Sequence, residues 1–180
     1  MHTIPNLGLS IPNGLLFVGI ISFCLTLFAY YNVNNVKSEV IIKIKKQEDK
    51  LSTFDFGLLY LNRFIHNFNT FFVITILFVF KPNLYLYMIT FIDILIASIN
   101  IEIFKNECPL TYLEKRILDN KYILNSTKDY EPYITLLTFK ENKSNFNRII
   151  GLILRVFIFL FVSICLYKHY FLPKSQTPFN

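Results

Sequence analysis

Five polar residues interrupt apolar stretches of the sequence and are the strongest candidates for chemistry: His66, Asp93, Asn100, Glu102 and Arg155. If those stretches are membrane-spanning helices, a rise of about 1.5 Å per residue places His66 and Arg155 roughly 8–9 Å from one membrane face. On the same scale Asp93 lies about 16 Å from that face. Ionisable groups at such depths are costly and mostly face a bundle interior or a cavity. We therefore predict a polar cluster near the inner face, between the second, third and fourth spans.

Two interpretations of this cluster remain open. In the structural one, Arg155 pairs with an acid and His66 with an asparagine, and such interhelical contacts contribute about 0.6–2 kcal/mol; Arg155 extending to the membrane surface is a variant. In the functional one, His66 and Asp93 form a proton relay, a catalytic pair, or a site for a lipid headgroup, a quinone or haem. Haem is poorly supported, because such sites mostly use two axial ligands and His66 is the only histidine within a span.

Cysteine spacing and charge argue against several other kinds of site. Cys24, Cys108 and Cys165 form no C-x-x-C pair and two of them lie in apolar runs, so neither a disulfide framework nor a zinc site is predicted. The net charge of +6 does not indicate nucleic-acid binding, because the basic residues lie in loops between apolar segments, where they orient membrane proteins. We expect no metal, no cofactor and no nucleic-acid partner.

Four apolar stretches would position these residues. The chain of 180 residues is 53% hydrophobic and only 17% charged, whereas soluble domains carry about 25% charged residues. Crossing a hydrocarbon core of about 30 Å takes about 20 apolar residues in a helix. The sequence therefore predicts an all-α membrane protein with a single domain over residues 1–180 and a bundle of about four transmembrane helices. The predicted spans are 14–31, 61–80, 83–104 and 149–167, with a helical hairpin turning at Lys81-Pro82.

The distribution of basic residues predicts the orientation. With four spans, both termini lie on one side together with three lysines, while thirteen Lys and Arg residues fall in the loops 32–60 and 105–148. This bias places the long loops on the cytoplasmic side, or its matrix equivalent, and both termini on the opposite side. The lysine-rich segment 36–52 is either an amphipathic element at the interface or a solvated loop or short helix.

The stretch ECPLTYLEKRIL, residues 107–118, begins just beyond the third span. Pro109 biases Cys108 towards an extended conformation. Thr111, followed three residues later by Glu114, has the pattern of a capping box that starts a new helix. We therefore predict a short amphipathic helix at the interface. Its apolar face would consist of Leu113, Ile117 and Leu118.

The same stretch resembles the Cys-Pro-Leu-Thr-x-Leu-Glu signature of a small family of multi-pass membrane proteins of unknown function, matched here by Cys108 to Glu114. In that family a preceding span carries a histidine followed by spaced phenylalanines, and LNRFIHNFNTFFVI places His66 at the matching position. A later Glu-x-Tyr motif is similar to YEPYITLL, residues 130–137. The resemblance covers roughly residues 57–170. It implies a multi-pass membrane fold and no particular activity.

Two functions therefore remain open. The first is a non-enzymatic accessory or structural subunit of a membrane assembly, whose aromatic surfaces contact lipid and protein partners. It is favoured because the sequence has no recognisable nucleophile, metal or phosphate motif. The alternative is a small membrane enzyme or carrier for a hydrophobic substrate, built on His66, Asp93 and Arg155.

Overall fold

The computed structural model describes residues 7–36, 38–76, 78–81, 83–104, 107–124 and 144–171, and in these ranges the chain is helical. An isolated bridge between Leu9 and Phe80 is the one β-type pairing within them. The all-α prediction is thus confirmed. The helices are α1 (Ile11–Asn35), α2 (Glu39–Glu48), α3 (Thr53–Thr75), α4 (Leu84–Ile103), α5 (Pro109–Leu118) and α7 (Ser144–Phe171).

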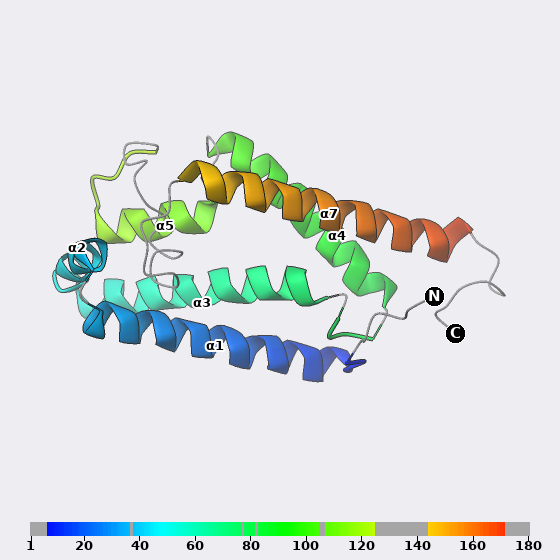
Figure 1. Cartoon of the computed structure of the whole chain (residues 1–180), viewed down its shortest axis with the longest axis horizontal. Helices are drawn as coiled ribbons and strands as arrows, with labels where there is room; N and C mark the ends of the chain where they lie inside the picture. The colour runs from blue at the N-terminus through cyan, green and yellow to red at the C-terminus, as the bar shows by residue number, and fades with distance from the viewer. Residues whose placement is uncertain are drawn as a thin grey trace.

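The four long helices form an elongated bundle (Figure 1). Helices α1 and α3 pack side by side in opposite directions, and α4 and α7 form a second, crossing pair. The start of α1 and the end of α7 lie at one end of the bundle, while the short helices α2 and α5 lie at the other. We call this second end the α2–α5 end.

Small side chains on α1 allow it to approach α3 closely. A buried row on α1 consists of Gly14, Val18, Ser22, Thr26, Ala29 and Val33. Residues spaced by three or four positions share one helix face, and small ones let two helix backbones come near each other. At Gly14 there is no room for a side chain, because the ring of Phe80 occupies the space that a Cβ would take.

One apolar core joins the four long helices. Its fully buried members include Val18 of α1, Phe80 after α3, Ile94 of α4 and Val162 of α7. Aromatic rings fill much of the remaining space, as in the stacked pair of Phe91 on α4 and Phe159 on α7, whose centroids lie 5.0 Å apart. The helical bundle is therefore held by shared packing, as expected for helices that bury one apolar face.

Helix α3 differs from the prediction of a helix over 61–80. It begins at Thr53, because Ser52 caps it by accepting a hydrogen bond from the Asp55 backbone N–H at 3.1 Å. It ends at Thr75, and the following segment 78–81 bonds to residues 7–9 instead. Three backbone hydrogen bonds of 2.8–2.9 Å join these two segments. Helix α3 therefore begins before the predicted span 61–80 and ends before the last residues of that span.

The other predicted spans agree more closely with the helices. The stretches 14–31 and 149–167 lie within α1 and α7, and 83–104 matches α4 within one residue at each end. In the described part of the chain, α1 is the helix that is long and apolar enough by itself to cross a bilayer. The apolar stretches of α4 (Leu84–Asn100) and α7 (Arg155–Tyr167) are shorter. The segment 36–52, predicted as either an amphipathic interfacial element or a solvated loop or short helix, contains helix α2.

Large apolar side chains cover the outer faces of α1, α4 and α7. On each helix they recur every three or four residues, which places them on one face. We call this surface the apolar belt. It consists of residues that are each at least half exposed: Leu16, Ile20, Phe23, Leu27, Ile89, Ile92, Ile96, Ile99, Leu152, Ile153, Val156, Phe157, Leu160 and Ile164.

Candidate functional site

Arg63 is the centre of a strongly connected polar group within the described part of the chain. Its side chain is fully buried on α3 between two carboxylates, with Nε donating to Glu114 of α5 at 2.7 Å and Nη2 forming an ion pair with Glu48 of α2 at 2.8 Å. The Tyr60 hydroxyl donates to the other Glu48 oxygen at 3.0 Å, and the guanidinium lies 4.8 Å from the centroid of the Tyr60 ring. Arg63 therefore ties three helices together at the α2–α5 end.

A second polar group fixes the segment after α5. Glu107 forms an ion pair with Lys115, and its two carboxylate oxygens share the proton of the Tyr122 hydroxyl, at 3.1 and 3.0 Å from the hydroxyl oxygen. The Asn62 side chain donates to the Leu110 backbone carbonyl at 2.9 Å, which joins α3 to the first turn of α5. These polar side chains thus hold neighbouring elements in place.

The predicted capping box does not form. Helix α5 begins at Pro109, with Cys108 as its N-cap residue in an extended conformation, so Thr111 lies inside the first turn. Proline is favoured at the first helical position because its missing N–H is not needed there. Glu114 is fully buried against Arg63 and does not reach back to cap the helix. The short helix itself is present, but Thr111 is buried within its first turn and does not cap it, and Glu114 pairs with Arg63.

Three residues of the predicted polar cluster have neighbours that the structure describes: His66, Asp93 and Arg155. His66 faces Cys108, with 4.0 Å between Nε2 and Sγ. Asp93 and Arg155 lie on the packed helices α4 and α7 and interact electrostatically. Asn100 is half-buried near the end of α4. The side chain of Glu102 and the motif at 130–137 lie outside the part of the chain that the structure describes.

Sequence reasoning missed the central role of Arg63. Asn62, Arg63, His66 and Asn67 lie on one face of α3, since their spacing of one, three and four residues matches a helical turn. Asn67 uses this face to bind α1, its amide donating to the Thr26 hydroxyl at 3.0 Å. The sequence did contain a signal for this polar face, because these four polar residues recur at helical spacing at the start of the predicted span 61–80.

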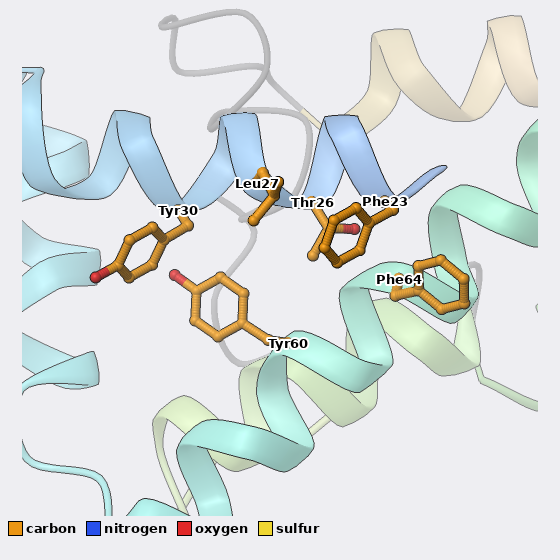
Figure 2. Close-up of a pocket in the computed structure, with 6 residues that line it drawn as sticks. All are labelled: Phe23, Thr26, Leu27, Tyr30, Tyr60 and Phe64. Carbon is orange, nitrogen blue, oxygen red and sulfur yellow. The ribbon is translucent and has the colours of Figure 1, made fainter. Parts of the chain in front are cut away.

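An apolar groove opens between α1 and α3 beside the Arg63 group. It has a volume of about 490 Å³ and is lined by Phe23, Thr26, Leu27, Tyr30, Tyr60 and Phe64. Figure 2 shows the Tyr60 ring extending from α3 towards Tyr30 on α1, and these two rings meet edge to face with centroids 5.7 Å apart. The groove has no acidic or basic side chain in its lining, so it suits apolar groups and offers little for acid–base chemistry.

The described residues contain no group of three or more His, Cys, Asp and Glu side chains that could hold a metal ion. No family model, curated protein or solved structure matches the chain. The resemblance of Cys108 to Glu114 to a family signature therefore stays a prediction. A function for this chain is therefore inferred from the geometry of its described residues.

Proposed function

We propose that this chain is an integral membrane protein whose four long helices cross the bilayer, and that it serves as a non-enzymatic accessory subunit of a membrane assembly. The apolar belt is the observation that carries this proposal. Exposed apolar patches larger than a few hundred Å² are rare on soluble monomers and mark membrane or protein contacts. Here large apolar side chains are exposed along α1, α4 and α7, and on each helix they recur every three or four residues and so share one face.

Helix length and polar satisfaction support a bilayer location. The apolar stretch of helix α4 covers Leu84–Asn100, which reaches the lower end of the about 17–25 residues that cross a hydrocarbon core. Hydroxyl groups on the long helices donate to backbone carbonyls one turn earlier, as Thr90 does to Leu86 at 2.8 Å and Ser98 to Ile94 at 2.7 Å. In lipid each polar group needs a partner within the protein, and this arrangement supplies one.

Charge supports the orientation with the α2–α5 end on the cytoplasmic or matrix-equivalent side. This end carries the lysine-rich helix α2 and the basic turns of α5, and thirteen of the 18 Lys and Arg residues fall in the two loops that contain these helices. Basic loops stay on the inner side of membranes.

The use of the polar side chains supports a structural role. Arg63, Glu48, Glu114, Asn62 and Asn67 all bind other elements of the same chain. Groups used in this way rigidify the bundle, while the apolar belt leaves wide faces for lipid and for a protein partner.

Native mass spectrometry after gentle extraction from the source membrane tests the assembly. We expect a complex heavier than the 21.3 kDa chain, with at least one further protein. Two matched triple variants then locate the contact: Ile89, Ile92 and Ile96 to Ala on α4, and Phe157, Leu160 and Ile164 to Ala on α7. One of them should release the partner while the other retains it. A single chain accompanied only by lipid would contradict the subunit proposal.

A further inference from the structure

A contact between Cys108 and His66 joins the start of α5 to α3. Cys108 directly precedes α5, has an extended backbone, and is only partly buried. Its Sγ lies 4.0 Å from Nε2 of His66 on α3. A thiol beside an imidazole is the usual arrangement of a nucleophile and its general base. When His66 carries its proton on Nδ1, Nε2 can accept the thiol proton.

A cation lies near the same thiol. Arg155 of α7 is within electrostatic range of Cys108 as well as of Asp93. Its Nη1 atom is buried and has no hydrogen-bond partner within the described part of the chain. Cys108 and His66 thus supply a nucleophile and a base, and the positive charge of Arg155 lies within electrostatic range of the thiol.

We propose that Cys108 is a site of S-acylation that accepts a long-chain acyl group from an acyl thioester such as an acyl-coenzyme A. Cysteines beside membrane spans or on amphipathic helices are the usual positions of this modification. Ile103 before Cys108 and Leu113 after it are both exposed, at 65% and 39%. They offer an apolar path for the acyl chain, a placement that rests on the proposed bilayer location.

The reaction balances without any further reactant. The Cys108 proton passes to Nε2 of His66 while Sγ forms a bond to the thioester carbonyl carbon. The bond between that carbon and the sulfur of coenzyme A then breaks, and the departing thiolate takes the proton from His66. One thioester is exchanged for another, with no change of oxidation state.

The test uses the purified full chain in detergent micelles with palmitoyl-coenzyme A, followed by intact mass spectrometry. The variant C24S/C165S keeps Cys108 as its single thiol, and C108S/C165S keeps Cys24. We expect one palmitoyl group, removable by hydroxylamine, on the Cys108 protein and none on the Cys24 protein. Adding His66→Gln should slow acylation roughly tenfold, less than the 10²–10⁴-fold of a well-aligned base because the contact is long.

Equal acylation of both single-cysteine proteins, or no acylation of Cys108, would overturn the proposal. So would an unchanged rate in a His66→Gln protein that keeps its helical circular dichroism spectrum. If that variant does not fold, the ratio of the acylation rates of the two single-cysteine proteins tests the proposal. Because transfer is measured on isolated protein, it is independent of bilayer insertion: a chain that is soluble without detergent and acylates at Cys108 would retain this site and refute the membrane location.

Discussion

Replacing Arg63 by Met lowers the free energy of unfolding by about 3–5 kcal/mol, the cost of removing one partner from a buried ion pair. Glu48 and Glu114 would then remain buried, at 6% and 0% exposure, without the cation that lies 2.8 and 2.7 Å from them. Denaturant unfolding in mild detergent, followed by circular dichroism, measures the effect.

The controls separate charge from packing. Arg116→Met removes an exposed arginine of the neighbouring helix α5 together with its one hydrogen bond of 3.0 Å to the Tyr122 backbone carbonyl, and should cost about 1 kcal/mol. The triple variant Arg63→Met, Glu48→Gln, Glu114→Gln should recover part of the loss, because no uncompensated charge stays buried. An Arg63→Met protein as stable as the unsubstituted chain would show that Arg63 does not hold the α2–α5 end together.

Leu160→Asp prevents stable membrane insertion of α7 if the apolar belt faces lipid. Leu160 is 55% exposed in the middle of this helix, and an aspartate at the centre of a span costs about 2.5–3.5 kcal/mol to insert. Ile123→Asp is the matched control, since Ile123 is 71% exposed at the α2–α5 end. The fraction of protein that stays in the membrane pellet after an alkaline wash measures both.

A lipid-facing belt and a water-facing belt predict different results in this experiment. A lipid-facing belt makes Leu160→Asp much more damaging than Ile123→Asp. A water-facing belt makes both substitutions nearly neutral, because surface changes away from special features have small effects. Equal retention of the two variants would therefore refute the bilayer location of α7.

The sequence predicted the long helices well because their apolar stretches are local signals. Helices α1, α4 and α7 enclose or closely match the predicted ranges. It failed at α3 because hydrogen bonds to residues 7–9 end that helix early. Those partners are some 70 residues away in the sequence, and no local pattern reveals them.

The capping box failed for a similar reason. Thr111 and Glu114 have the right spacing, but Pro109 starts the helix earlier and Arg63, 51 residues away, binds Glu114. The contact between His66 and Cys108 spans 42 residues, so the sequence could place each residue near the inner face but could not pair them. The positions of the long helices could be predicted from local patterns, but the partners of residues far apart in the sequence could not.

The water accessibility of Cys24 tests the bilayer location most directly. Cys24 lies midway along α1 and is exposed on the surface of the folded chain. In a C108S/C165S background, opened membranes would be treated with a water-soluble maleimide, with Ile123→Cys in a cysteine-free chain as the accessible control. We predict that the control is labelled and that Cys24 is labelled only after the membrane is dissolved in SDS. Rapid labelling of Cys24 in the folded protein would place this face of α1 in water and contradict the membrane-spanning bundle.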